Sequence, residues 1–284
     1  MRISATLLFV PLLGAALALQ GVEKPKIDWQ ESPVKGVLLN KAELSLPDGY
    51  LFTGVSGTKT FLELTENFPS GKEAGMFMPR PEEGKDNKNW FVIFEYHDVG
   101  YVKDDEKNKI DANKLLKTLQ EGTESANEER TKRGWPTLQL VSWSQPPQYD
   151  PRTNNLTWGT LLRDSKGQES INYTTRMLGR GGYMQVDLVT GTEEFKAAVA
   201  DYETAMATFT FTSNNRYAEF KKGDKIATIG LTALVAGGAG AALAKTGLLG
   251  KFWKLLIPVF LAIGAFFKKI WNKLRGIQEE ETRD

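Results

Sequence analysis

The sequence predicts an α+β domain in which an antiparallel sheet, a meander, is packed by helices and followed by one or two C-terminal hydrophobic helices. A run of apolar and aromatic residues at 90–96 and four later strand candidates predict the sheet. Short Pro-, Gly- and Asn-rich segments join these candidates, which favours antiparallel pairing because parallel strands need long crossovers. Two amphipathic segments predict the helices.

The first half of the domain is predicted as strands, a short helix and a loop. Residues 36–46 alternate loosely before a Pro-Asp-Gly turn, which indicates one or two strands, and residues 57–67 are typical of a short helix. Residues 70–88 are rich in Pro, Gly and charge and are predicted as a loop. Residues 90–96 are predicted as a central strand that is covered on both faces.

The second half is predicted to begin with the longest helix. Asp111 is a suitable N-cap, and Gly134 follows the last apolar position. A second helix is predicted at 193–207, and residues 208–212 are expected to extend toward a membrane. Four strands are predicted between the two helices, at 137–143, 156–163, 169–178 and 183–190.

Composition excludes several classes of site. The 284 residues include no cysteine, so a disulfide framework, a thiolate nucleophile and a cysteine zinc site are excluded. His97 is the single histidine, which argues against a metal site with two imidazoles. We therefore expect no cofactor and no metal.

Charge is distributed unevenly along the chain. Residues 21–224 contain 26 Lys and Arg against 31 Asp and Glu, whereas residues 225–284 contain 9 against 4. An acidic main domain is a poor nucleic-acid binder, because phosphate contacts need clustered cations. A basic tail beside apolar runs suits anionic membrane lipid.

The N-terminus is typical of a secretory signal. Residues 1–18 comprise Arg2, an apolar stretch and a small-x-small cleavage site, and the run is short for a membrane span. An uncleaved N-terminal anchor is the alternative. Residues 19–33 are predicted as a linker, and residues 34–222 as an extracytoplasmic α+β domain.

The C-terminal region predicts a transmembrane helix at 226–249. Its first 19 residues, Ile226–Ala244, carry no charge, and about 20 apolar residues span a bilayer. Ala233, Gly237 and Ala241 recur four residues apart, a spacing that lets membrane helices pack closely and form an oligomer. A buried helix in a water-soluble domain is the alternative.

A second apolar segment, 252–275, is predicted either to return across the bilayer or to lie at its interface. More cations follow this segment than lie between the two runs, so the positive-inside rule favours a cytoplasmic C-terminus. Residues 276–284 are expected to be a disordered acidic tail. The predicted location is the bacterial inner membrane, with the main domain facing the periplasm.

Several uncommon strings together resemble one family. They are Gly100–Asp105, Glu121–Glu124, Asn127–Arg130, Arg133-Gly134 with Pro136, Pro146–Asp150, Asn172–Arg180, Tyr217–Phe220 and Gly223–Lys225. The chain resembles the bacterial membrane-anchored proteins grouped as DUF2167 over roughly residues 35–250. The family is one of unknown function, so the resemblance implies the topology and no catalytic residues. The order of a meander, a helix and Phe209-x-Phe211 also resembles the layout of PsbP/Mog1-like domains.

The best candidates for chemistry follow the central strand. Glu95 and His97 share one face of that strand, and Asp98, Asp104 and Asp105 come directly after it. Carboxylates with one imidazole can bind a divalent cation or act as acid and base. A solvated turn before a helix is the alternative, with Asp111 of this stretch serving as the N-cap.

Two further groups are candidates for binding. Glu121, Glu124 and Glu128 share a stripe of the long helix, which is either an acidic docking surface or a solvated face. Arg176 and Arg180 are candidates to meet an anionic partner or these same glutamates. The glycines around Arg180 lack the P-loop pattern, so nucleotide binding is not predicted.

Our first hypothesis is a membrane-anchored extracytoplasmic binding or scaffold domain of the bacterial envelope, with lipid and an envelope protein as partners and no nucleic acid. The alternative is a hydrolase or metal-assisted enzyme that uses Glu95, His97 and the turn at Asp104 and Asp105. A third hypothesis assigns the function to helix assembly through the C-terminal region.

Overall fold

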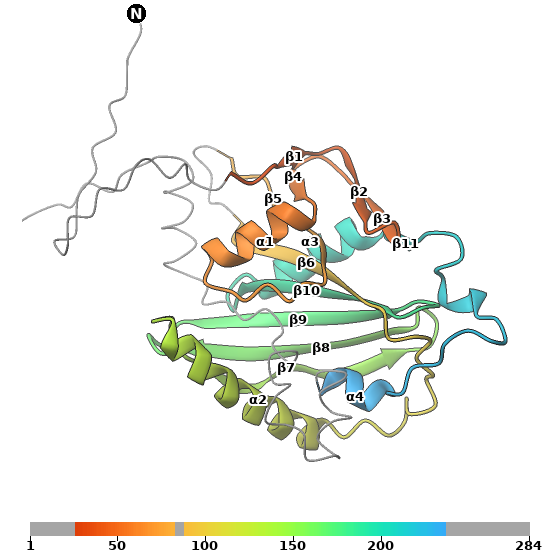
Figure 1. The fold of residues 1–284 in the computed structure, drawn as a ribbon. Helices are drawn as coiled ribbons and strands as arrows, with labels where there is room; N and C mark the ends of the chain where they lie inside the picture. The colour runs from red at the N-terminus through yellow and green to blue at the C-terminus, as the bar shows by residue number, and fades with distance from the viewer. Residues whose placement is uncertain (1–25, 83–87, 237–284) are drawn as a thin grey trace, which may run out of the picture.

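A computed structural model describes residues 26–82 and 88–236, which form an α+β domain with two antiparallel sheets (Figure 1). The larger sheet has eight strands in the order β1-β4-β5-β6-β10-β9-β8-β7, and the smaller has the order β11-β3-β2. The strands are β1 (Gln30–Glu31), β2 (Val34–Leu38), β3 (Ala42–Leu46), β4 (Tyr50–Thr53), β5 (Glu73–Pro79), β6 (Trp90–His97), β7 (Leu138–Asp150), β8 (Asn155–Asp164), β9 (Glu169–Leu178), β10 (Tyr183–Gly191) and β11 (Thr210–Phe211). The helices are α1 (Val55–Leu64), α2 (Ala112–Lys132), α3 (Phe195–Met206), α4 (Leu231–Val235) and the 3-10 helix η1 (Tyr217–Glu219).

The antiparallel meander is confirmed in the second half of the domain. β7, β8, β9 and β10 pair in sequence order, as the short turns between them require. β10 then pairs with β6, so α2 carries the chain from β6 to the far edge of the sheet at β7. The predicted central strand, β6, is flanked by β5 and β10 and is buried along nearly its whole length.

The larger sheet is covered on both faces. Phe94 of β6 packs with α3 and the three-stranded sheet, on what we call the α3 face. Phe91 and Ile93 point to the opposite face and pack with α1. Leu115 of α2 and Leu231 of α4 pack at the far end of that face, which we call the α1/α4 face (Figure 1). Between α1 and α4, the α1/α4 face carries a row of polar side chains.

α2 forms where the sequence predicts it and covers an exposed sheet edge. The Asp111 carboxylate accepts a hydrogen bond from Lys114 N at 3.0 Å, which satisfies one free N–H of the first turn. Gly134 follows the helix with φ +69°, a conformation that favours glycine. The Asn127 side chain donates to the backbone oxygen of Leu138 at 2.7 Å and accepts from its N–H at 2.8 Å. These contacts occupy the outer backbone groups of Leu138 at the start of β7, where unpaired edge groups otherwise invite intermolecular pairing.

Three segments differ from the sequence prediction. The end of the predicted linker 19–33 contains β1, which pairs with β4, and Ile27, which is buried against the α1 core. The predicted loop at 70–88 contains β5, a strand that is buried along its whole length. Residues 210–211, which were predicted only as an extended connection, form β11 and pair with β3. Each of these strands is stabilised by a partner distant in sequence, which local pattern does not reveal.

The start of the predicted transmembrane segment packs on the domain. Ile226 forms a parallel bridge with Tyr101, and Ile229 and Leu234 are buried in the apolar cluster between α2 and the sheet. α4 includes only Leu231–Val235. Thus Ile229, Leu234 and their neighbours in the segment predicted at 226–249 pack on the domain, whereas Ile226 stays 39% exposed.

Several predicted regions lie outside the described residues. These are the signal at 1–18, the first part of the linker, residues 237–249, the second apolar segment at 252–275 and the tail at 276–284. Within residues 26–82 and 88–236, every helix is too short or too polar to cross a bilayer.

Candidate functional site: a buried polar row

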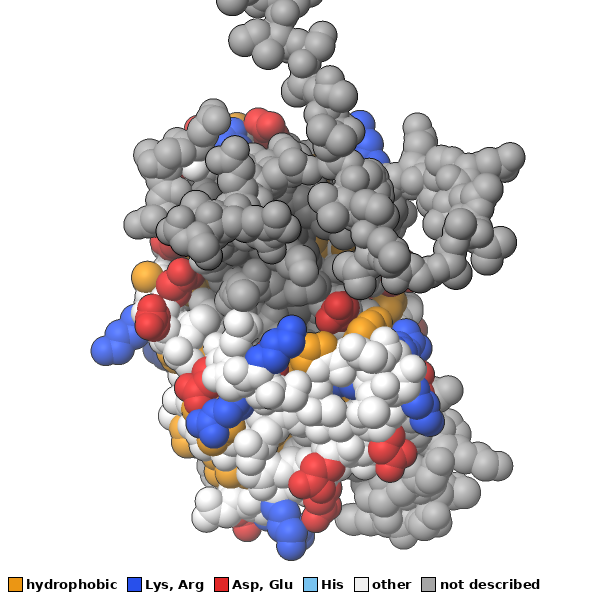
Figure 2. All heavy atoms as spheres, turned by 90° about the vertical axis from the view of Figure 1, so that its left-hand side faces the viewer, with side chains coloured by type: hydrophobic (Ala, Val, Ile, Leu, Met, Phe, Trp, Pro, Cys, Tyr) orange, Lys and Arg blue, Asp and Glu red, His pale blue; other side chains and the backbone are white. Residues whose placement is uncertain are grey.

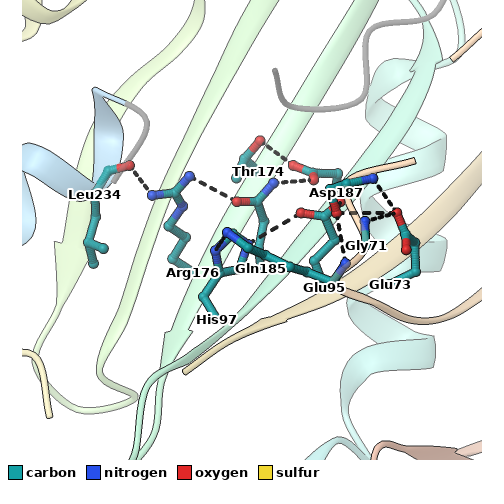
Figure 3. A network of polar contacts seen from close by, with 11 residues as sticks. Gly71, Glu73, Glu95, His97, Thr174, Arg176, Gln185, Asp187 and Leu234 are labelled. Atoms are coloured by element: carbon teal, nitrogen blue, oxygen red, sulfur yellow. Dashed lines mark hydrogen bonds and ion pairs between the residues drawn. The ribbon is translucent and has the colours of Figure 1, made fainter. Parts of the chain in front are cut away.

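Four adjacent strands place polar side chains in a row on the α1/α4 face (Figure 3). Glu73 of β5 pairs with Glu95 of β6, Glu95 with Gln185 of β10, and Gln185 with Arg176 of β9. We call the following set the polar row: Glu73, Glu95, His97, Thr174, Arg176, Gln185 and Asp187. Apart from His97, these residues are at most 5% exposed. Charges buried to this degree need paired or hydrogen-bonded surroundings.

Glu95 and Glu73 share the hydroxyl group of Ser70. Ser70 Oγ lies 2.7 Å from Glu95 Oε1 and 3.2 Å from Glu73 Oε1, and the single hydroxyl hydrogen can serve only one of them at a time. Glu73 Oε1 also accepts from the N–H groups of Ser70 and Gly71. Burial raises the pKa of Glu95, and the neighbouring Glu73 charge raises it further. Protonation of Glu95 would relieve this repulsion.

His97 lies between a cation and an anion. Its Nδ1 is 3.3 Å from Lys72 Nζ, and its Nε2 is 3.3 Å from Glu95 Oε2. An ammonium group has only hydrogens to donate, so Nδ1 accepts and the ring proton belongs on Nε2, which donates to Glu95. The ring also stacks on Tyr183 at 4.5 Å. Burial lowers the pKa of His97 to about 2, and the charges of Arg176 and Lys72 contribute, so the imidazole is neutral at physiological pH.

Asp187 is the most enclosed carboxyl of the row. It is 1% exposed and accepts hydrogen bonds from Thr174 Oγ1 at 2.6 Å and Gln185 Nε2 at 2.7 Å. Burial raises the pKa of Asp187 to about 6, and the charge of Glu95 adds to this effect against the two hydrogen bonds. Asp187 therefore keeps its proton to a higher pH than an exposed aspartate does.

Arg176 links the row to the C-terminal segment. Its guanidinium donates to Gln185 Oε1 at 2.8 Å and to the backbone oxygen of Leu234 in α4. The same group lies over the rings of Trp158 and Tyr183, at 5.3 and 4.9 Å. The planar guanidinium suits these simultaneous contacts better than an ammonium group would. Arg176 is thus committed to the interior and does not meet an external anion.

The chemistry open to this row is proton exchange between buried groups. Glu95 and Asp187 both hold a proton more tightly than exposed carboxyls do, and Arg176 and Lys72 supply positive charge beside them. Within the two described ranges, no group of three or more His, Asp and Glu side chains is arranged to hold a metal ion.

The predicted acidic cluster does not assemble around His97. Of the predicted residues, only Glu95 contacts the imidazole. Asp98 is exposed, and its charge acts on Tyr96 of the opposite face, where burial and Asp98 raise the pKa to about 12. Asp104 pairs with Lys107 at 3.7 Å, and Asp105 is exposed in the same loop. The alternation along β6 correctly predicted that Glu95 and His97 lie on the same face. The loop that follows β6 leads Asp104 and Asp105 away from His97.

The predicted binding residues fall into two unrelated places. The stripe formed by Glu121, Glu124 and Glu128 is exposed on α2. Over the left-hand side of the domain, Figure 2 shows acidic and basic side chains interspersed rather than a field of one sign. Arg180 instead forms two 2.7 Å hydrogen bonds with the Asp224 carboxylate. Neither Arg180 nor Arg176 meets the glutamates.

The small-residue stripe is described only at its first member. Ala233 is partly buried against the apolar cluster around α4. Gly237 and Ala241 lie outside the described residues, so the predicted membrane packing through this stripe remains a prediction.

Sequence reasoning missed Glu73, Thr174, Gln185 and Asp187. A usable signal was present on β10, where Gln185 and Asp187 stand two residues apart between apolar neighbours. Polar side chains at period two in a strand covered on both faces indicate a buried polar row. Glu73 gave no such signal, because its strand was predicted as a loop.

The comparisons with known proteins identify the family. A family described as a protein of unknown function, DUF2167, matches residues 30–268. The chain belongs to the DUF2167 family. Several of the strings on which the resemblance was based meet at one end of the sheet: the Tyr101 ring stacks on Tyr217 at 4.4 Å, and Arg180 pairs with Asp224.

Matches outside the family are weak. No curated protein matches the chain. The solution structure of cyanobacterial PsbP (CyanoP) from Synechocystis sp. PCC 6803 is 12% identical, with a TM-score of 0.38, and covers 68% of this chain and 98% of that one. The Saccharomyces cerevisiae Ran-binding protein Mog1p is 11% identical, with a TM-score of 0.32 and the same two coverages. Likenesses at these scores carry no argument about function.

Proposed function

We propose that this DUF2167 protein is a membrane-anchored extracytoplasmic binding domain of the bacterial envelope, and that it takes a polypeptide segment of another envelope protein. The observation that carries this proposal is a groove on the α3 face, beside α3, which residues of β7, β8 and β9 line together with Phe209 and Phe211. Two depressions of about 370 and 390 Å³ adjoin at Asn155 and form what we call the Asn155 groove.

The lining of the Asn155 groove suits an extended peptide. Met177, Phe209 and Phe211 provide apolar contact at one end. Gln148 and Thr157 provide amide and hydroxyl groups at the other end, where a peptide backbone can donate and accept hydrogen bonds. Binding sites commonly combine an apolar floor with a few polar groups in this way.

Charge in the groove is balanced. Asp150 and Arg152 line one end and pair with each other at 3.1 Å, so they present no net charge to a ligand. A neutral groove fits a polypeptide better than a nucleic acid, whose binding needs clustered cations. The single imidazole is held inside the polar row and is not available to this groove.

The proposed anchor lies after the packed segment at 226–236. The basic and apolar composition of residues 237–275 supports membrane association, and export by residues 1–18 would place the domain outside the cytoplasm. Sodium carbonate extraction of native membranes tests this part: an anchored protein stays in the pellet.

Site-specific photocrosslinking tests the groove. A photoreactive residue at Gln148, within the groove, should give one defined adduct in cells, whereas the same residue at Lys117, on the exposed face of α2, should not. Thr157→Trp, which fills the groove from β8, should abolish the Gln148 adduct and preserve the far-ultraviolet circular dichroism spectrum. Equal labelling from both positions, or none from Gln148, would refute the proposed role of the groove.

A further inference from the structure

The segment from η1 to the start of α4 projects from one end of the domain (Figure 1). It combines exposed apolar and basic side chains. Phe220 and Ile226 are each 39% exposed, a high value for side chains of this size. Lys221, Lys222 and Lys225 lie between them and are exposed. We call residues 217–226 the basic-aromatic loop. Apolar tips among lysines are typical of surfaces that enter the headgroup region of an anionic bilayer.

The basic-aromatic loop is held firmly by the domain. The Tyr101 ring contacts Tyr217 at 4.4 Å and Phe220 at 4.3 Å, and the Tyr217 hydroxyl donates to the Val102 oxygen at 2.9 Å. Backbone hydrogen bonds join Tyr101 to Lys225 at 2.8 Å and to Ala227 at 2.9 Å. The exposure of the apolar side chains is therefore built into the fold.

Both acidic residues of the loop are paired with neighbours: Glu219 accepts a hydrogen bond from Arg216 N at 3.0 Å, and Asp224 pairs with Arg180. The Asp224 carboxylate accepts two hydrogen bonds from Arg180 and one from Lys221 N, and these contacts lower the pKa of Asp224 to about 2. Lys225 Nζ lies 3.4 Å from a backbone oxygen, that of Asp98, which leaves its charge uncompensated. The loop thus keeps an outward positive charge although residues 21–224 are acidic overall.

The position of the loop in the chain favours a lipid surface over a protein. The loop ends at Ile226, and the chain continues through α4 into residues 237–284, where apolar runs are interspersed with Lys and Arg. We infer that the basic-aromatic loop docks the domain on the anionic headgroups of the membrane, with Phe220 and Ile226 at the interface. This inference rests on the membrane association in the proposed function and assigns it a second contact, separate from the anchor. Tyr217 and Ala218, at the start of the loop, also line one end of the Asn155 groove, whereas Phe220, Ile226 and the three lysines do not.

The absence of native cysteine makes a depth measurement direct. Ala218 of the full chain is changed to cysteine and labelled with bimane. The labelled protein is reconstituted in phosphatidylcholine vesicles that contain about 30% phosphatidylglycerol and nitroxide-labelled lipid. Nitroxide should quench the label at Ala218 and not a label at Lys117 on α2. Quenching should fall in vesicles of phosphatidylcholine alone and in high salt, because the lysines act through screened charge.

A charge-matched pair of variants tests the mechanism. Changing Lys221, Lys222 and Lys225 to Gln should weaken docking about 100-fold, at about fivefold for each lysine. The control changes Lys114, Lys117 and Lys132 of α2 to Gln, which alters net charge equally and should preserve quenching. Ile226→Ser should also reduce quenching, with an unchanged circular dichroism spectrum.

The outcomes distinguish a failure of the docking inference from a failure of the proposed membrane anchor. A carbonate-resistant protein whose Ala218 label is quenched no more than the Lys117 label overturns the inference and leaves the anchor intact. Quenching that survives the loop lysine variant also overturns it. A protein that carbonate extracts, but whose Ala218 label is quenched by added anionic vesicles, shows that the anchor is wrong and the loop assignment stands.

Discussion

Asp187→Asn should change how stability depends on pH. Asp187 is 1% exposed, and burial raises its pKa from 3.8 to about 6. Because the folded state then binds this proton more tightly than the unfolded state, the free energy of unfolding falls as pH rises through that interval. At 1.36 kcal/mol per pH unit, the difference between these two pKa values corresponds to a total loss of about 3 kcal/mol in the free energy of unfolding. About 2 kcal/mol of this loss occurs between pH 4.5 and 7.

The asparagine fits the site, so the variant isolates the charge. Its side-chain NH₂ can donate to Thr174 Oγ1, whose hydroxyl hydrogen rotates away, while its oxygen accepts from Gln185 Nε2. Gln185 keeps its present orientation, which its hydrogen bond with Arg176 requires. The variant should therefore fold and lose only the pH-dependent penalty.

Urea denaturation followed by tryptophan fluorescence at several pH values measures the effect. The stability of the variant relative to the wild-type protein should increase by about 2 kcal/mol from pH 4.5 to 7. Asp105→Asn, at an exposed position, controls for the loss of one negative charge. A difference between wild type and Asp187→Asn that stays constant across this range would refute the reasoning, because it would mean that Asp187 is ionised throughout.

Two further predictions concern the polar row, and a third concerns the contact between α2 and β7. The single histidine should give one set of imidazole ¹⁵N signals, those of a neutral ring protonated on Nε2, unchanged from pH 5 to 8; a titrating signal would contradict the contacts of His97. Arg176→Met should destabilise the fold by about 3–5 kcal/mol, because the buried carboxylates lose their cation. It should also give faster amide hydrogen exchange at residues 231–236 of the α4 region, because the Leu234 oxygen loses its hydrogen-bond donor. Arg176→Lys should recover only part of this loss, and full recovery would show that the guanidinium geometry is unimportant. Asn127→Ala should lower the free energy of unfolding, measured by urea denaturation, by about 1–3 kcal/mol, because the N–H and the oxygen of Leu138 both lose their hydrogen-bond partner. An unchanged free energy of unfolding would mean that water replaces the Asn127 amide.

The candidate site shows which of its residues can be predicted from local sequence pattern. Period-two alternation placed Glu95 and His97 on one face of β6 without knowledge of any other strand. Lys72 and Ser70, which set the proton position on His97 and bind Glu95, come from a segment predicted as a loop. Their approach depends on β5 pairing with β6, a contact between residues some twenty positions apart.

The sequence by itself determined the features that arise from short-range forces. The central strand, the cap of α2 at Asp111, the meander from β7 to β10 and the amphipathic α3 all follow from side-chain period and turn residues. The family also followed from strings of neighbouring residues.

Only the tertiary structure decided what surrounds residues 226–236. Ile229 and Leu234 are apolar, and apolar side chains leave water equally well for lipid or for a protein interior. The deciding contacts are long-range: Arg176 donates to the Leu234 oxygen, and Tyr101 bridges Ile226. Hydrophobicity explains why apolar side chains such as Ile229 and Leu234 leave water. The shape and polarity of the opposing surface determine against which partner they pack.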